Sequence, residues 1–196
     1  MNQHTKFPAD ALSETRRFTA DEFMAMGEAG IFGPDERVEL LAGEILVMSP
    51  AGRFHEVLRT ELALIWGQDC LRRGFKVVEE MQLRLTDDHQ PVVDVGVFPA
   101  KLVAPDARGT DMLLVVEIAD TSLTLDTTVK AAAYAAGGVR EYWVVDARTR
   151  STLIHREPDG ANGGTYAVTF EVPADQVATP LLVPELAVRM GEFPGA

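Results

Sequence analysis

The sequence predicts one α/β domain in which helices cover both faces of a central sheet. Two nearly continuous apolar runs, residues 91–98 (PVVDVGVF) and 111–118 (DMLLVVEI), are typical of central strands covered on both faces. Helical patterns flank this pair, over residues 52–73 and 125–136, and a further buried strand follows at 141–146. This order indicates a layered α/β architecture, and 196 residues suffice for one substantial core but not for two ordinary domains.

The N-terminal part predicts an arm followed by a short helix. Residues 1–17 are polar and without periodicity, so we expect a flexible arm before a single domain that spans residues 18–196. Thr19 and Glu22 have the spacing of a capping box, which predicts a helix from about Ala20 to Gly27.

A β-hairpin is predicted for residues 37–50 (RVELLAGEILVMSP), around a two-residue turn at Ala42-Gly43. The turn places four apolar side chains on one face, in the cross-strand pairs Leu40–Ile45 and Val38–Val47. Glu39 then points to the opposite face, where a solvated side chain is the default interpretation.

The helix over residues 52–73 opens after Ser49-Pro50 and is ended by Gly74. Its apolar stripe contains His55, Leu58, Leu62 and Ile65. A lone histidine in such a stripe is more often a core residue than a ligand.

The remaining elements complete the sheet. A strand is predicted over residues 76–85, and two outer strands over 148–155 and 165–172. Gly137-Gly138 stops the second helix, and the proline- and valine-rich tail has no pattern that settles its structure.

The composition limits the function. The net charge of −12 disfavours nonspecific DNA binding, which usually needs a basic face, although bound divalent cations would reverse the local sign. The single cysteine, Cys70, indicates a reduced, cytoplasmic protein, and no apolar run is long enough to cross a membrane. Residues at zinc-ligand spacing and phosphate-binding glycine loops are missing from the sequence.

Two carboxylates interrupt the apolar strands and are the strongest candidates for chemistry. Asp94 lies among valines, and Glu117 follows the run Leu113-Leu114-Val115-Val116. A buried carboxylate is costly unless it is paired, hydrogen-bonded or bound to a cation, and oxygen ligands of this kind suit Mg²⁺ or Mn²⁺. Alternatively, each carboxylate faces solvent at a strand end or pairs with an arginine, and spacing alone does not decide.

Lys130 lies four residues after Asp126 on the second predicted helix. Spacing alone favours an exposed ion pair worth about 0.3–0.5 kcal/mol. The alternative is a cation that reaches a phosphate or an attacking water.

Several segments, in this order, resemble the Uma family of putative restriction endonucleases, in the PD-(D/E)XK nuclease superfamily. They are FTADEFMAM, RVELLAGEILVMSP, FHEVL, VVDVGVF, LLVVEIADTSL, Asp126 with Lys130, and YAAGGVREYWVVD. The resemblance runs from about Phe18 to Arg156. It implies a restriction endonuclease-like core, in which a central mixed sheet is flanked by helices, and a site where two strands diverge.

Carried over by position, the resemblance gives each site residue a role. Asp94 and Glu117 match the acidic positions of the family motif, Glu39 and His55 match positions near the site, and Lys130 matches a helix lysine. The resemblance implies that Asp94 and Glu117, joined by Glu39, hold Mg²⁺ or Mn²⁺. Lys130 would orient a water or stabilise charge on phosphorus, and His55 would line the pocket or hydrogen-bond a ligand carboxylate.

Two departures from the motif bear on catalysis. Val93 stands where the motif has proline, and Ala119 stands where it has lysine, so Lys130 would have to replace that lysine. The expected function is hydrolysis of phosphodiester bonds in DNA, in a homodimer if both strands are cut. The alternatives are a non-catalytic binding or partner module that retains the fold, and a nuclease acting on RNA or on an unusual nucleotide structure.

Overall fold

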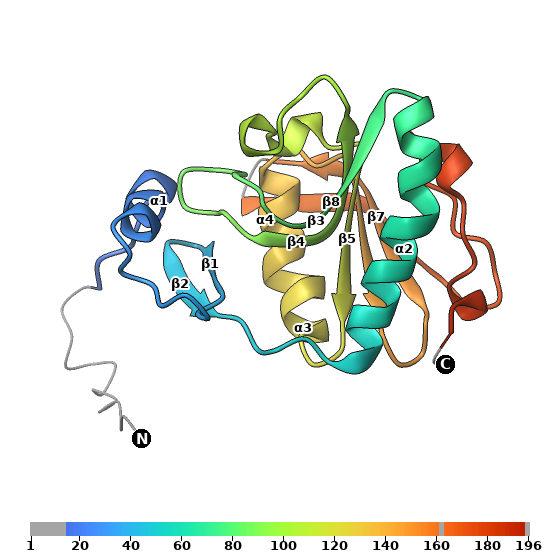
Figure 1. Ribbon diagram of the computed structural model, residues 1–196, viewed down its shortest axis with the longest axis horizontal. Helices are drawn as coiled ribbons and strands as arrows, with labels where there is room; N and C mark the ends of the chain where they lie inside the picture. The colour runs from blue at the N-terminus through green and yellow to red at the C-terminus, as the bar shows by residue number, and fades with distance from the viewer. Residues whose placement is uncertain (1–14, 161–162, 195–196) are drawn as a thin grey trace.

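A computed structural model describes residues 15–160 and 163–194 and confirms the α/β architecture. Six strands form one sheet in the order β3-β4-β5-β6-β7-β8, and two more form a separate hairpin, β1-β2 (Figure 1). Only β5 and β6 pair in parallel within the six-stranded sheet, so the sheet is mixed. Its strands are β3 (Phe75–Gln82), β4 (Val92–Pro99), β5 (Leu114–Ala119), β6 (Glu141–Asp146), β7 (Thr152–Asp159) and β8 (Thr165–Val172).

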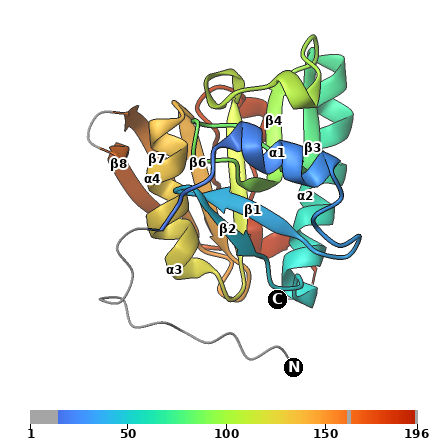
Figure 2. The ribbon, with the colours of Figure 1, turned by 90° about the vertical axis from the view of Figure 1, so that its left-hand side faces the viewer.

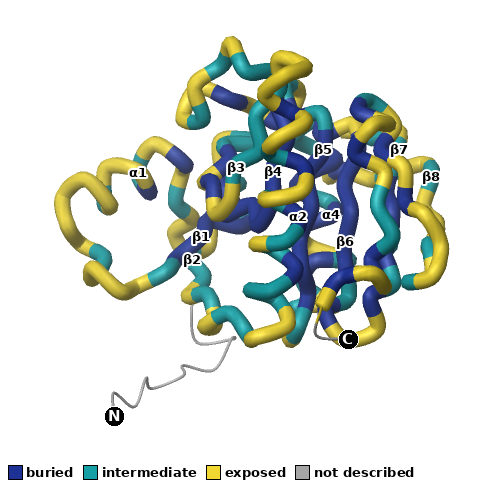
Figure 3. The backbone as a smooth tube through the Cα atoms, turned by 45° about the vertical axis from the view of Figure 1, so that its right-hand side comes forward, coloured by how far each residue is buried: buried dark blue, intermediate teal, exposed yellow. Residues whose placement is uncertain are grey.

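The central strands are buried along almost their whole length (Figure 3). This burial confirms the prediction made from their continuous apolar runs. The boundaries differ from the prediction at three places: residues 109–111 form a 3₁₀ turn before β5, β3 ends at Gln82, and the outer strand predicted over 148–155 is β7 at Thr152–Asp159.

Helix α2 (Arg53–Arg72) covers one face of the sheet (Figure 1). Leu58, Leu62, Trp66 and Cys70 are its buried side chains, and the Trp66 ring meets the Trp143 ring edge-on at 6.4 Å. The predicted stripe is therefore wrong at Ile65, which is 52% exposed. The tail, which the sequence left open, packs on the same core through Val183, Leu186, Met190 and Phe193.

The second helical region covers the opposite face and is not one continuous α-helix as predicted. It consists of α3 (Leu123–Leu125), a π-helical turn η4 (Asp126–Lys130) and α4 (Ala131–Ala136). A π-turn adds a residue to the helical repeat, and such turns occur often at functional sites. Here the turn buries both Asp126 and Lys130.

The N-terminal elements lie beside the sheet in Figure 1 and face the viewer in Figure 2. They are α1 (Ala20–Glu28), β1 (Val38–Leu41) and β2 (Glu44–Val47), and both predicted cross-strand pairs of the hairpin are present. Ala42 and Gly43 have φ of 50° and 73°, as a tight two-residue hairpin turn requires. Backbone hydrogen bonds between Leu40 and Gln90 attach the hairpin to the loop between β3 and β4.

The predicted arm, residues 1–17, lies outside the described residues except for 15–17. In the described part of the chain, no helix combines the length and the apolar character that a membrane span needs.

Candidate functional site

Strand register brings Asp94 and Glu117 together. Antiparallel pairing of β4 and β5 matches Val95 with Val116, and one further step along this register places Asp94 opposite Glu117. The pairing ends at Val95–Val116, so the strands begin to separate at the two carboxylates. Oδ2 of Asp94 accepts a hydrogen bond of 2.8 Å from the backbone N–H of Ile118. Both carboxylates line the same pocket.

His55, in the first turn of α2, contacts Asp94. Its Nε2 lies 2.9 Å from Oδ2 of Asp94, and its side chain is 12% exposed. Burial alone would raise the pKa of Asp94, but His55 and the Ile118 N–H outweigh it and hold this pKa below its usual value. His55 is therefore neither a purely apolar core residue nor distant from the carboxylates.

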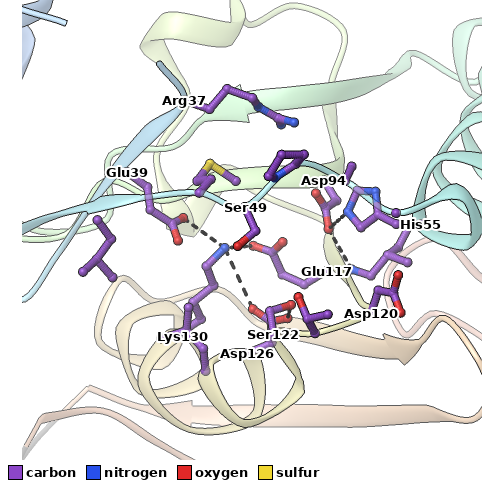
Figure 4. A pocket seen from close by; sticks show the side chains of 18 of the residues that line it. Arg37, Glu39, Ser49, His55, Asp94, Glu117, Asp120, Ser122, Asp126 and Lys130 are labelled. Atoms are coloured by element: carbon purple, nitrogen blue, oxygen red, sulfur yellow. Dashed lines mark hydrogen bonds and ion pairs between the residues drawn. The ribbon is translucent and has the colours of Figure 1, made fainter. Parts of the chain in front are cut away.

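Lys130 lies at the centre of a group of carboxylates (Figure 4). Its Nζ is 3.0 Å from Oε2 of Glu39, 3.3 Å from Oε1 of Glu117 and 4.0 Å from Oδ1 of Asp126. Burial would lower the pKa of Lys130, but the carboxylates, Glu117 first, raise it above its usual value. The interpretation as an exposed ion pair is therefore wrong, and the ammonium stays protonated.

Glu117 and Asp126 are acids whose ionised forms are costly here. Burial raises the pKa of Glu117 well above its usual value, against the attraction of Lys130. Burial also raises the pKa of Asp126, to about 6, although Lys130 and a hydrogen bond from Ser122 oppose this. Tyr134 donates its hydroxyl to Oε1 of Glu117.

Glu39 reaches the site from the hairpin. Its Oε2 accepts a hydrogen bond of 3.3 Å from the backbone N–H of Val92, and the residue is 3% exposed. The default interpretation as a solvated side chain is wrong, because this face of the hairpin packs toward Lys130 instead of toward water.

These side chains line one pocket of about 600 Å³. All five predicted site residues contribute to it: Glu39, His55, Asp94, Glu117 and Lys130. Sequence reasoning gave no site role to Arg37, Asp120 or Ser122, which also line it. It also missed Tyr134, although the spacing from Lys130 to Tyr134 is that of one helical face.

The geometry can be compared with what a metal ion needs. Among the described residues, no group of three histidine, cysteine or acidic side chains is arranged to hold a metal. Mg²⁺ is usually bound by only one or two carboxylates together with water and substrate phosphate. The contacts of Asp94 with His55 and Ile118 use Oδ2, and those of Glu117 with Lys130 and Tyr134 use Oε1. Each carboxylate thus has a second oxygen available for a cation.

A family model described as "Putative restriction endonuclease", Uma2, matches residues 20–191. The chain belongs to the Uma2 family. The match covers most of the chain, including every residue of the site, and confirms the resemblance found in the sequence. In this Uma2 chain the strand lysine of the nuclease motif is absent, and Lys130 lies beside the acidic pair instead.

One solved structure supports the fold of this Uma2 protein. A putative nuclease belonging to DUF820 from Anabaena variabilis ATCC 29413 aligns with a TM-score of 0.70 at 17% identity. The alignment covers 89% of this chain and 96% of that one. A search of curated proteins gave no match.

Proposed function

We propose that this Uma2 protein is a metal-dependent endonuclease that hydrolyses phosphodiester bonds in DNA. The observation that carries the proposal is the pairing of Asp94 with Glu117 in one pocket, beside the buried ammonium of Lys130. Membership of a family described as putative restriction endonucleases supports the nuclease class.

The cofactor in this proposal is Mg²⁺ or Mn²⁺, held by Asp94 and Glu117. Glu39 would join them as a further ligand by exchanging its contact with Lys130 for one with the cation, since the described side chains form no ready set of three ligands. The donors are carboxylate oxygens on adjoining strands, which suit a hard cation that keeps several waters. Such a cation would polarise the phosphodiester and lower the pKa of a water molecule. It would also offset the burial, and with it the repulsion from Asp94 and Asp126, that raise the pKa of Glu117.

The protein's own side chains would position and stabilise the reacting groups. Lys130 stays protonated, so it would not act as a base; it would orient the attacking water or stabilise negative charge developing on the phosphoryl oxygens. His55 would hold Asp94 ionised and correctly oriented, because its contact favours the charged carboxylate.

The test is cleavage of plasmid and linear DNA by purified protein with Mg²⁺ or Mn²⁺. We expect activity that EDTA abolishes and that Asp94→Ala reduces by roughly 10²-fold or more, as removal of a group that acts on the transition state does. Asp106→Ala, which removes an exposed carboxylate outside the pocket, is the matched control. Equal activity in Asp94→Ala would mean a contaminant or a different site.

A non-catalytic binding module is the second candidate. Lys130 already compensates Glu39 and Glu117 without a metal, and the chain has a net charge of −12. Lack of Mn²⁺ binding at millimolar concentration would favour this candidate. A homodimer is a separate proposal, and light scattering of the purified protein tests it.

A further inference from the structure

The side chains that would act on a phosphodiester lie at the bottom of the pocket. Asp94 is 5% exposed, Glu117 2% and Lys130 3%. Duplex DNA is stiff, with a persistence length of about 50 nm, and offers its phosphates on the outside of a wide helix. A single strand can bend into a narrow groove and bring one phosphate to buried groups. The depth of the site therefore favours a strand that is not held in a duplex.

The pocket has the size of a site for one small unit of substrate. Its volume of about 600 Å³ falls within the range of roughly 300–1,000 Å³ that small-molecule sites occupy. Its floor is polar, whereas the hairpin and the loop after it contribute the apolar side chains of Leu46, Val47, Met48 and Pro50. A nucleotide has the same two parts, an apolar base face and a charged phosphate. Only an unpaired base can present its face to such a wall, because paired bases are stacked on both sides.

The charge beside the pocket acts against a duplex. A second hollow shares Arg37, Val47 and Met48 with the pocket and is also lined by Asp35, Glu36 and Glu56. Arg37 is already paired with Glu80 at 2.6 Å. A duplex carries about one negative charge per 1.7 Å of its axis, which is twice the density of one of its strands. Repulsion from this acidic flank is therefore greater for the duplex.

We infer that the pocket takes an unpaired segment of DNA, such as a single strand or the open part of a bubble, in preference to an intact duplex. This inference rests on the proposed nuclease function and names its substrate class. The base lies against Leu46 and Met48, since Leu46 pairs with Glu39 on the face of the hairpin that meets the site, and the phosphate reaches Lys130 and the carboxylates below. One site suffices to cut a single strand, so the inference does not require the proposed homodimer.

The experiment compares three fluorescein-labelled DNAs of one sequence: a single strand, the full duplex, and a duplex with a central bubble. Cleavage is followed with Mg²⁺ or Mn²⁺, and binding is measured by fluorescence anisotropy with Ca²⁺ in place of Mg²⁺. We expect the single strand and the bubble to be cut at least about 10-fold faster than the duplex, with cuts confined to the open segment, and to bind in the same order.

A pair of surface variants tests where the base lies. Val47 and Leu71 are 70% and 68% exposed, so substitution of either by aspartate should leave the protein folded, but only Val47 lines the pocket. Val47→Asp should weaken single-strand binding by roughly 5- to 10-fold, and Leu71→Asp should leave it unchanged. An unchanged affinity of Val47→Asp for the single strand would show that the base does not lie against this side of the pocket.

The outcomes separate the inference from the function on which it rests. If Asp94-dependent cleavage of the duplex is as fast as that of the single strand, the inference is overturned and the nuclease function stands. If the wild-type protein cuts none of the three DNAs with either metal, the proposed function fails and the inference fails with it.

Discussion

Replacing Lys130 by methionine should destabilise the fold more than replacing an exposed lysine does. The change removes the only ammonium within 4.0 Å of Glu39, Glu117 and Asp126 in the described part of the chain, and it keeps most of the apolar stem of the side chain. The three acidic side chains then lose their compensating charge while they stay buried.

The expected cost follows from this burial. Breaking a buried ion pair by removing one partner costs about 3–5 kcal/mol, because a charge remains without compensation. For a chain of this length each kcal/mol lowers Tm by roughly 2–4 °C, so Lys130→Met should lower Tm by about 6–20 °C near neutral pH. Lys101→Met, at an exposed position, is the control and should change stability by no more than about 0.5 kcal/mol.

The cost should also depend on pH. The pKa of Asp126 is raised from 3.8 to about 6, so its folded form binds protons more tightly than the unfolded chain does. Stability associated with this acid is fully present below pH 3.8 and is lost as pH rises through about 6. Lys130 lowers this pKa, so in Lys130→Met the loss should extend to higher pH. The variant should therefore come closest to the wild type in acid.

Thermal melts of wild type, Lys130→Met and Lys101→Met between about pH 5 and pH 8 measure this dependence. Adding Glu117→Gln to Lys130→Met should recover part of the lost stability, because it removes one of the buried charges that Lys130 no longer compensates. A loss below about 1 kcal/mol that is the same at every pH would refute the reasoning, since it would mean that Lys130 does not compensate buried charge.

Three further predictions concern neighbouring positions. His55→Gln should raise the pKa of Asp94 and weaken Mn²⁺ binding, measured by calorimetry, by about 10- to 100-fold. An unchanged Mn²⁺ affinity would show that His55 does not support the metal site. Tyr134→Phe should lower the free energy of unfolding, measured in urea, by about 1–2 kcal/mol, because Glu117 loses a hydrogen bond. An unchanged free energy of unfolding would show that this hydrogen bond does not stabilise the fold. Gly52→Ala should cost about 1 kcal/mol, because its Cβ would displace the Asp120 carboxylate, which is paired with Arg148. Gly67→Ala, with open space around it, should stabilise α2. Equal effects of the two substitutions in thermal melts would contradict the clash.

Local patterns were sufficient to predict most elements of the fold. The hairpin around Ala42-Gly43 depends on turn chemistry and on alternation within one segment, so its register could be derived from the sequence. Asp94 and Glu117 were identifiable because a charge within a buried strand needs a compensating partner.

Features that depend on packing between distant segments could not be derived in this way. The burial of Glu39 depends on which face of the hairpin meets Lys130, and these two residues are 91 positions apart (130 − 39). The π-turn changes the phase of the second helix, and no local signal predicted it. The buried residues of α2 recur every four positions, so Trp66 and not Ile65 faces the sheet, where its ring meets that of Trp143.

Calorimetric titration of Mn²⁺ into the wild type and Asp94→Asn tests most directly whether Asp94 and Glu117 form a cation site. The substitution keeps the size of the side chain and removes its charge, and Asp106→Asn is the matched control at an exposed position. We predict saturable binding at millimolar Mn²⁺ that Asp94→Asn weakens by at least about 10-fold and Asp106→Asn leaves unchanged. Equal binding by the wild type and Asp94→Asn, or no binding by either, would contradict the proposed site.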